Sequence, residues 1–451
     1  MAKQRTRRQK AIIRRRIFLS CCAVVLAAII ALLVFVVHSI VTPNDKPDKN
    51  GPTGNDSLVS SEPEIKETFA TVLSTGDIMV HSTQLDGAYV KGTGDYDFSA
   101  FFKECSPYFK GADLAVANLE VTFGGTESGK FSGYPAFNTP DSLADVIKES
   151  GLNFLLTSNN HSYDTGLFGL KRTAQVLKQK GIEFIGTRET EAEPIYKVKE
   201  INGIKIGMAN YTYESSPQNA LAGRKYINGS IISSQANNLI SSFSYNKIDE
   251  FYADAQNTIN SMKQNGAEFI VFYMHWGNEY KLQANTWQKN IAQKLSNLGV
   301  DIIVGSHPHV IEPVELIHSE DGQNTTVCLY STGNAVSNQR QEIMDSCPSG
   351  HTEDGMFFSY TLRKGADGVT LDSIDLIPTW VNKYRGGSGY QYTIYPLEAP
   401  DWGNTKYGLD STAAAKAAKS FERTKAIVAE GLTACQQEIG CEITFADTVI
   451  N

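Results

Sequence analysis

The stretch "VDIIVGSHPHVIEP", residues 300–313, places two histidines one residue apart, directly after an apolar run. The apolar residues before Gly305 predict a short buried strand, and Gly305 and Pro308 end it. A strand that stops in a Gly/Pro turn delivers the next side chains to the rim of an α/β sheet, where the sites of such folds usually lie. Two imidazoles there, His307 and His309, could bind a metal ion; the alternative is two polar residues in an exposed loop.

The N-terminal residues have the pattern of a membrane anchor. Residues 1–16 carry eight Lys or Arg and no acidic residue, and residues 17–37 form an uncharged run of 21 residues. A helix of this length spans roughly 30 Å, the thickness of a bilayer core. The basic flank predicts a cytoplasmic tail, a single transmembrane helix and a cell-membrane protein whose main domain lies outside the cell. The alternative is a cleaved signal peptide, but the run is long for one and no clean cleavage site follows it.

A spacer and an acidic domain follow the predicted anchor. Residues 38–68 are rich in Pro, Gly, Ser, Asn and Asp, which is typical of a flexible linker. The chain has a net charge of −8, and residues 1–16 contribute +8, so residues 17–451 carry about −16. A domain this acidic is a poor general binder of nucleic acid, and we expect no nucleic-acid partner. If the domain handles an anionic substrate, local cations must act there, and a bound divalent metal ion would supply them.

The order of the predicted elements indicates a layered α/β fold. Strand-like segments alternate with amphipathic helical segments from residue 68 to residue 313, and a run of strand-like segments follows up to residue 380. The dipeptide Asn202-Gly203 between two alternating runs predicts a tight β-hairpin. Residues 411–437 are expected to form a C-terminal helix that packs against the core. This order predicts an α/β sandwich with mixed sheets.

Polar residues follow five of the predicted strands, at the point where each strand ends. They are Asp77; Asn118 and Glu120; Asn160 and His161; His275; and His307 and His309. Because several strand ends of such a sheet converge on one edge, we expect these side chains to lie together. Carboxylate, amide and imidazole form a mixed O/N set suited to Mn, Fe or Zn. Two such ions roughly 3.5–4 Å apart could clamp a phosphoryl group and activate a water.

Each of these residues also has a purely structural explanation. Asp77 could cap a turn, and Asn118 and Glu120 alternate with apolar residues as in any half-exposed strand. His275 could be a core histidine with satisfied hydrogen bonds. His81 has no strong context and is expected at the surface. Coincidences at five strand ends are nevertheless harder to accept than any single one, which favours the metal site.

Six motifs in order resemble the bacterial capsule-synthesis family, which is typified by the CapA/PgsA subunit of poly-γ-glutamate synthesis. They are "GDIMVH", "ANLE", "SNNHSYDTG", "HWGNEY", "GSHPHVIEP" and "YSTGN". The resemblance implies a CapA-like domain over residues 69–395, followed by a C-terminal helical extension over 396–451. An N-terminal membrane anchor is usual in that family. The family is similar to the metallophosphoesterases of the calcineurin-like fold, a four-layer αββα sandwich with a two-metal centre.

The resemblance also implies a role for each candidate residue. His161 would assist the leaving group with Asp164 as its partner, and Asp164 and Glu279 would fix imidazole tautomers. Asn118 and Asn334 are expected beside the ligands or the substrate. The implied metal ligands, for two divalent ions, are Asp77, Glu120, Asn160, His275, His307 and His309. The chain departs from the broader phosphoesterase pattern at its opening, where Asp77-Ile78-Met79 replaces Asp-x-His, so that one ligand is missing, and at "ANLE", where Gly-Asp-x-x-Asp is usual.

Three functions fit these observations. In the first, the chain anchors, guides or exports an anionic polymer such as poly-γ-glutamate for a membrane-bound synthase complex. In the second, it is an extracytoplasmic metal-dependent hydrolase that acts on a phosphoester or related bond of an envelope component, and His161 protonates the leaving oxygen. In the third, it is a surface receptor with a degenerate site. The intact pairs Asn160/His161 and His307/His309 speak against the third function.

Overall fold

The computed structural model describes residues 66–387, 389–398, 406–446 and 448–450. The elements below belong to one compact unit, Ile65–Asn451. The expected tail 1–16, the expected transmembrane helix 17–37 and the expected linker as far as residue 65 lie outside the described residues. Within the described ranges, no helix has both the length and the apolar composition needed to cross a bilayer.

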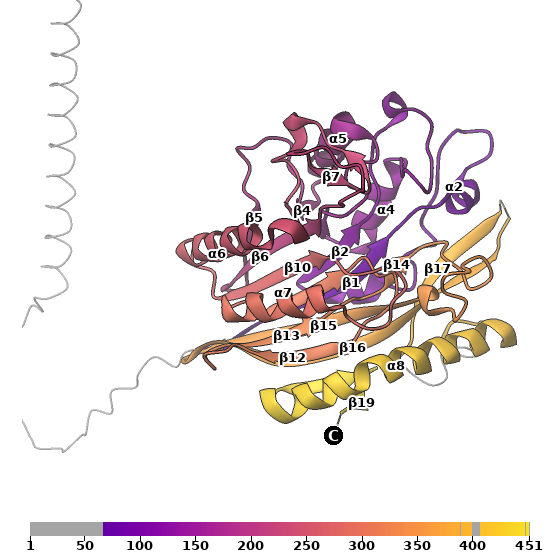
Figure 1. Ribbon diagram of the computed structural model, residues 1–451. Helices are drawn as coiled ribbons and strands as arrows, with labels where there is room; N and C mark the ends of the chain where they lie inside the picture. The colour runs from indigo at the N-terminus through magenta and orange to yellow at the C-terminus, as the bar shows by residue number, and fades with distance from the viewer. Residues whose placement is uncertain (1–65, 388, 399–405, 447, 451) are drawn as a thin grey trace, which may run out of the picture. The chain divides into compact units, whose positions relative to one another are not determined.

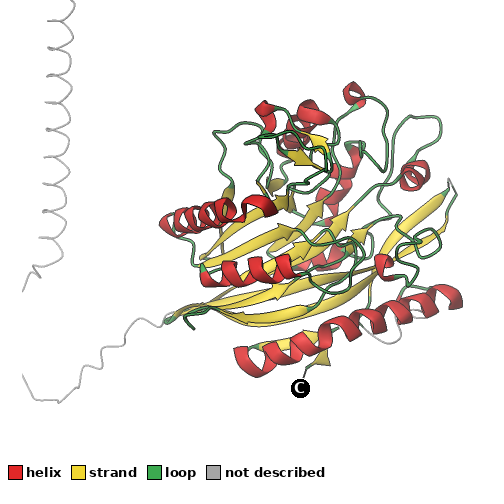
Figure 2. Cartoon of the chain, in the orientation of Figure 1, coloured by secondary structure: helices red, strands yellow, loops and turns green. Residues whose placement is uncertain are grey.

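The first sheet is mixed and has ten strands (Figures 1 and 2). They are β1 (Thr68–Ile78), β2 (Leu114–Leu119), β3 (Phe154–Leu156), β4 (Glu183–Ile185), β14 (Asn334–Val336), β15 (Asp354–Gly365), β16 (Gly368–Arg385), β17 (Tyr390–Pro396), β18 (Glu442–Phe445) and β19 (Thr448–Val449). The main order is β19-β18-β16-β15-β1-β2-β3-β4, with β14 paired to β1 and β17 to β16. Strands β1 to β4 run parallel, whereas β15 is antiparallel to β1 and to β16.

The second sheet is also mixed and has seven strands. They are β5 (Tyr196–Ile201), β6 (Ile204–Tyr213), β9 (Ser242–Phe243), β10 (Phe269–His275), β11 (Ile302–Ser306), β12 (Val314–His318) and β13 (Thr325–Leu329). The order is β12-β13-β11-β10-β6-β5, with β9 paired to β6. The central strands β6, β10, β11 and β13 run parallel. All seven residues of β10 are buried, as expected for a central strand with both faces covered.

Helices cover the outer faces of both sheets. They are α2 (Ser82–Ala88), α3 (Ser106–Gly111), α4 (Ser142–Ser150), α5 (Gly166–Lys180), α6 (Ile248–Gln264) and α7 (Thr286–Asn297). Residues of α2 to α5 pack with the outer face of the first sheet, and residues of α6 and α7 pack with that of the second. Val72 of β1 and Val271 of β10 belong to the apolar core between the sheets. The described unit therefore has helix, sheet, sheet and helix layers, and the predicted sandwich with mixed sheets is confirmed.

A long C-terminal helix, α8 (Ser411–Ile439), closes one side of the sandwich (Figure 1). It begins at Asp410, whose side chain accepts a hydrogen bond from the backbone N–H of Ala413 at 2.8 Å. It contacts β12 of the second sheet and β16 and β18 of the first, and its Val428 and Leu432 join the core between the sheets. The segment expected as a helical extension thus also contributes two strands, β18 and β19, to the first sheet. They have four and two residues and are too short to stand out in the sequence.

The predicted hairpin is present between β5 and β6. Ile201 pairs with Ile204, and the two turn residues Asn202 and Gly203 have φ values of 50° and 83°. Positive φ at both positions is the requirement of the type I′ turn that Asn-Gly supplies. The turn therefore fixes the register of the edge pair in the second sheet.

Candidate functional site

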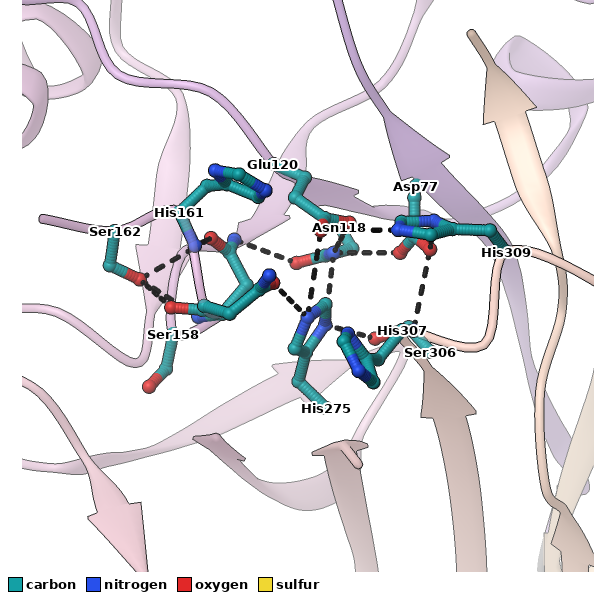
Figure 3. Close-up of polar contacts among 12 residues, drawn as sticks. Asp77, Asn118, Glu120, Ser158, His161, Ser162, His275, Ser306, His307 and His309 are labelled. Atoms are coloured by element: carbon teal, nitrogen blue, oxygen red, sulfur yellow. Dashed lines mark hydrogen bonds and ion pairs between the residues drawn. The ribbon is translucent and has the colours of Figure 1, made fainter. Parts of the chain in front are cut away.

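The strand ends of both sheets meet at one edge of the sandwich. β1 reaches Asp77 one residue before its end, and Glu120 directly follows β2. From the second sheet, His275 ends β10 and Ser306 ends β11. Figure 3 shows Asp77, Glu120 and His275 pointing toward one another. Because these strands are parallel within each sheet, their C-terminal ends lie on the same side, and residues far apart in the sequence are brought together.

Asn118 holds the two carboxylates of the site. Its side-chain amide donates hydrogen bonds to Asp77 Oδ1 at 2.7 Å and to Glu120 Oε2 at 3.3 Å. The side-chain amide of Asn159 donates in turn to Asn118 Oδ1 at 3.1 Å. Asp77 and Glu120 are fully buried. The amide network therefore fixes the orientation of Asn118. The other oxygens of both carboxylates lie on the side of the histidines, where Asp77 Oδ2 accepts a hydrogen bond from the backbone N–H of His307 at 3.3 Å.

Glu120 has a buried oxygen without a hydrogen bond. Among the described residues, Glu120 Oε1 has no hydrogen-bond partner, and it lies 3.7 Å from His275 Nε2 and 3.8 Å from His309 Nε2. Burial, and then the neighbouring charge of Asp77, raise the pKa of Glu120 well above its usual range. A cation between these atoms would relieve both costs, because it would replace the lost hydration of the carboxylate and offset its repulsion with Asp77.

His275 is held at both of its ring nitrogens. Its Nδ1 lies 2.9 Å from Ser306 Oγ, and its Nε2 lies 2.7 Å from Asn160 Oδ1. Burial, and then the charges of nearby histidines, lower the pKa of His275 well below its usual value. The ring is therefore neutral at physiological pH, and a neutral imidazole is the form that binds metal ions.

The turn after β11 presents His307 and His309 in an unusual backbone conformation. Their φ values are 97° and 57°, which non-glycine residues rarely adopt. His309 Nδ1 lies 3.2 Å from Asp77 Oδ2 and 3.1 Å from Asn334 Oδ1. His307 is buried, its Nδ1 has no hydrogen-bond partner within the described ranges, and its ring centre lies 4.8 Å from that of Tyr213. Burial also lowers the pKa of His307 well below its usual value.

The potential ligand atoms form three groups, in each of which they lie within 4.8 Å of one another. The groups are Glu120, His275 and His307; Asp77, Glu120 and His309; and Glu279, His307 and His309. The first two groups are fully buried and share Glu120. Carboxylates and neutral imidazoles in such an arrangement are compatible with divalent metal binding.

His161 and Asp164 form a separate pair beside this cluster. His161 Nδ1 lies 2.7 Å from Asp164 Oδ2, which also accepts a hydrogen bond from the backbone N–H of Phe137 at 2.7 Å. The ring of Phe137 contacts the ring of His161 edge to face, with centres 4.7 Å apart. Asp164 therefore fixes the orientation of the imidazole, and Nε2 is the ring nitrogen left for another partner.

The structure brings the predicted site residues together, but one of them, Glu279, differs from its neighbours in being exposed to solvent. Glu279 is exposed, whereas the two histidines near it are buried. Asn334 is buried, and its side-chain amide donates to the backbone oxygen of His309 at 3.2 Å and to that of Thr352 at 3.0 Å. Asn334 therefore contacts His309 twice: its side-chain nitrogen donates to the backbone oxygen of His309, and its side-chain oxygen lies next to His309 Nδ1. The roles proposed for these residues as ligands or catalytic groups stay predictions.

Sequence reasoning missed several neighbours of the site. Ser306 and Tyr213 contact His275 and His307, but a serine and a tyrosine at strand ends carry no signal of their own. His81 is half-buried and not a surface residue: its Nδ1 accepts a hydrogen bond from the Asn338 N–H at 3.3 Å. Burial lowers the pKa of His81 to about 4. Its place in "GDIMVH", four residues after the predicted ligand aspartate, was the available signal.

Comparisons with known proteins place these motifs in a family. The family model described as "Bacterial capsule synthesis protein PGA_cap" matches residues 71–339. The "PGA biosynthesis protein CapA" of Bacillus subtilis (strain 168) is 27% identical over 332 residues, which cover 71% of this chain and 77% of the relative. The "Capsule biosynthesis protein CapA" of Bacillus anthracis is 25% identical over 313 residues, which cover 68% of this chain and 66% of the relative.

Solved structures show a more distant likeness. The calcineurin-like phosphoesterase YfkN from Bacillus subtilis is 13% identical, with a TM-score of 0.38 over 80% of this chain and 98% of that chain. The family model, in contrast, spans more than half of the present chain and includes the cluster from Asp77 to Asn334. The resemblance carried by the six motifs is thereby confirmed, and the chain belongs to the bacterial capsule synthesis protein family PGA_cap.

Proposed function

We propose that this chain is a membrane-anchored protein of capsule polymer biosynthesis or export, with its main domain outside the cell and a site for two divalent metal ions. Family membership supports the capsule role, as do the names of the two relatives. The basic residues 1–16 and the apolar run 17–37 support the anchor. The polymer, by analogy with the "PGA" relative, is poly-γ-glutamate.

The observation that carries the metal site is a pair of buried polar atoms without partners. Glu120 Oε1 and His307 Nδ1 are both buried, and neither has a hydrogen bond to any described residue. Leaving such atoms unpaired costs about 1–3 kcal/mol each, more for a charged group. They face a set of carboxylate, amide and imidazole donors that fits Mn, Fe or Zn. Glu120 and His307 belong to one group whose potential ligand atoms lie within 4.8 Å of one another, so one bound cation would contact both residues.

The residues of the site would divide the work as follows. Asp77, Glu120, Asn160, His275, His307 and His309 would hold the metal ions. Bound divalent ions would supply the positive charge that an acidic domain needs to hold an anionic group. Asn118 and Ser306 would keep Glu120 and His275 in place through their hydrogen bonds. The carboxylate of Glu279 is exposed and would lie between the buried ligands and the solvent.

A second function is favoured by one observation, the hydrogen-bonded pair of His161 and Asp164. Such a pair can hold a proton at His161 Nε2 and deliver it to a leaving oxygen. The chain would then be a metal-dependent hydrolase of a phosphoester in an envelope component. Turnover of a phosphodiester panel with added Mn²⁺, lost in His161→Gln, would support this function. An inactive wild type that has bound its metal would favour the polymer-handling role.

Metal analysis of the purified full-length chain tests the proposal directly. We expect about two equivalents of Mn, Fe or Zn per wild-type chain after loading and desalting. The double variant His307→Ala/His309→Ala should lose most of this metal. His318→Ala is the matched control, because His318 is an exposed histidine whose Nε2 lies 2.9 Å from Glu438 Oε2, outside the site. A wild type that stays metal-free, or a double variant that keeps its metal, would contradict the proposal.

Direct handling of the polymer has its own test. The full-length chain is passed over immobilised poly-γ-glutamate at several salt concentrations. Retention at low salt that falls with added salt is expected, because the contacts are electrostatic. Absence of retention at low salt would argue against direct handling and leave the chain a structural subunit of a membrane synthase complex.

A further inference from the structure

A hollow in the surface lies beside the candidate metal site. It has a volume of about 800 Å³, which is within the usual range of ligand pockets, and is lined by parts of β6, β9, α6 and the connection between β6 and β9. A smaller groove of about 540 Å³ contains His307, Tyr213 and Glu279 of the site. Both are bordered by Glu214, Ser215, Ser216 and Asn246. The large hollow therefore adjoins the groove that opens onto His307 of the candidate metal site.

Two of the four basic residues that line the hollow already have carboxylate partners. Lys225 Nζ lies 3.1 Å from Glu214 Oε1, and Lys247 Nζ lies 3.0 Å from Glu250 Oε1. Because each pair joins one positive and one negative charge, the two pairs add little net charge to the hollow.

The other two basic residues, Arg188 and Arg224, have no carboxylate partner among the residues that the structure describes. Within the described part of the chain neither forms an ion pair shorter than 4 Å, and the hydrogen bonds of their guanidinium groups go to backbone oxygens. Arg188 donates to the oxygens of Glu193, at 2.9 Å, and Asn238. Arg224 donates to the oxygen of Ile232 at 3.2 Å. Neither guanidinium is therefore neutralised by direct contact with a carboxylate.

Arg188 has a further unsatisfied donor. Its Nε is buried and, among described residues, has no hydrogen-bond partner. The remaining acid that lines the hollow, Asp254, accepts a hydrogen bond from the Tyr211 hydroxyl at 2.8 Å and does not pair with either arginine within 4 Å. Carboxylate and phosphate oxygens are the acceptors that suit a guanidinium group best.

We propose that this hollow is a subsite for an oxyanion, a carboxylate or phosphate group, that belongs to the same extended substrate as the group held at the metal site, and that Arg188 and Arg224 bind it. The inference rests on the proposed function for the statement that one substrate spans both places. It does not need the metal for binding of the anion itself. The side chains that line the hollow carry four positive and three negative charges, so its lining has a net charge of +1 in an otherwise acidic domain. Arg188 and Arg224 would set a second anchoring point away from the metal ligands.

The subsite predicts how binding affinity depends on the length of the substrate. A ligand with a single anionic group would occupy either the groove at His307 or the hollow at Arg188. A linear chain with repeated oxyanions would occupy both places. We therefore expect affinity to rise from monomeric to oligomeric anions, because the second anchoring point becomes available within one molecule.

The test measures binding of two probes to the full-length chain by calorimetry at low salt with a chelator present. The probes are a linear γ-linked glutamate oligomer and inorganic phosphate, which distinguish the two sources of an oxyanion. The variants are Arg188→Gln, Arg224→Gln and the double variant. Arg363→Gln is the matched control: it removes the same charge from β15 of the first sheet, where Arg363 pairs with Glu67 at 2.7 Å.

We expect each substitution to weaken binding of the preferred probe about tenfold, the loss expected for one charge-assisted contact. The double variant should lose still more, and Arg363→Gln should match the wild type. The probe with the higher wild-type affinity identifies the source of the anion. Unchanged binding in the double variant, or no binding of either probe to the wild type, would overturn the inference. Because metal is absent from this assay, a failed metal analysis would sink the proposed function and leave this result standing.

Discussion

Glu312 is a buried acid next to the site that should make the stability of the protein depend on pH. It follows the His307/His309 turn, is fully buried, and its Oε2 accepts a hydrogen bond from the side-chain amide of Gln288 at 2.6 Å. Its Oε1 has no hydrogen bond to any residue in the described ranges. Burial raises the pKa of Glu312 from its ordinary value of 4.5 to about 8, against a smaller lowering by the bond from Gln288.

The size and sign of the effect follow from this pKa. Between about pH 4.5 and pH 8 the unfolded chain has released the proton that the folded chain retains, so unfolding becomes easier as the pH rises. The contribution of Glu312 to stability is fully present below pH 4.5 and is lost as the pH rises through about 8. A difference of one pKa unit corresponds to about 1.4 kcal/mol, so the total loss is at most about 5 kcal/mol.

The assay compares Glu312→Gln with the wild type by urea unfolding at several values from pH 5 to pH 9 in a metal-free buffer. Glutamine keeps the volume of the side chain and the oxygen that accepts from Gln288, but it cannot ionise. The wild type should lose up to about 1.4 kcal/mol per pH unit relative to this variant until about pH 8. Glu320→Gln, at an exposed site, is the control for removal of a charge. Parallel pH profiles for Glu312→Gln and the wild type would refute the reasoning, because the histidines of the site are common to both proteins.

Two further predictions concern the segment that holds the site. Gly305→Ala would place a methyl group 1.8 Å from the backbone oxygen of Tyr330 and should lower the free energy of unfolding by several kcal/mol, whereas Gly111→Ala meets nothing and should be nearly neutral in thermal unfolding. Ser306→Ala removes the hydroxyl that holds His275 and should weaken metal binding by about 10–100-fold in a competition titration. Unchanged affinity would mean that Ser306 does not orient the imidazole.

Much of the fold could be predicted because its signals are local. Apolar runs stopped by glycine or proline gave the parallel strands, and Asn202-Gly203 gave the hairpin with its register. The ends of those strands then gave the candidate cluster, because parallel strands place their C-terminal ends on one edge. The neighbouring positions in the cluster, such as Asp77 beside Asn118, follow from β1 pairing with β2.

The remaining features depend on contacts between distant residues, which a single sequence does not display. Strands β3 and β4 have only three residues each. Their place in the first sheet is decided by the pairing of β3 with β2 and of β4 with β3. The hydrogen bond that His81 accepts from the backbone N–H of Asn338 joins two residues far apart in the chain. Among the described residues, Arg188 and Arg224 have no carboxylate partner, and this becomes clear only in the structure, where nearby Glu214 and Glu250 pair with lysines.

The position of β1 has a mechanical consequence. This first described strand lies inside the ten-stranded sheet, between β15 and β2, and not at its edge. A pulling force on the chain ahead of Thr68 would act along β1 and load its hydrogen bonds to the neighbouring strands in shear. The seven residue pairs with β15 and the six with β2 would share this force. Tension from a tether would therefore be resisted by a strand that is paired on both of its sides. That strand carries Asp77 near its far end, so the point where the force enters and the candidate metal site are joined by a single stiff element.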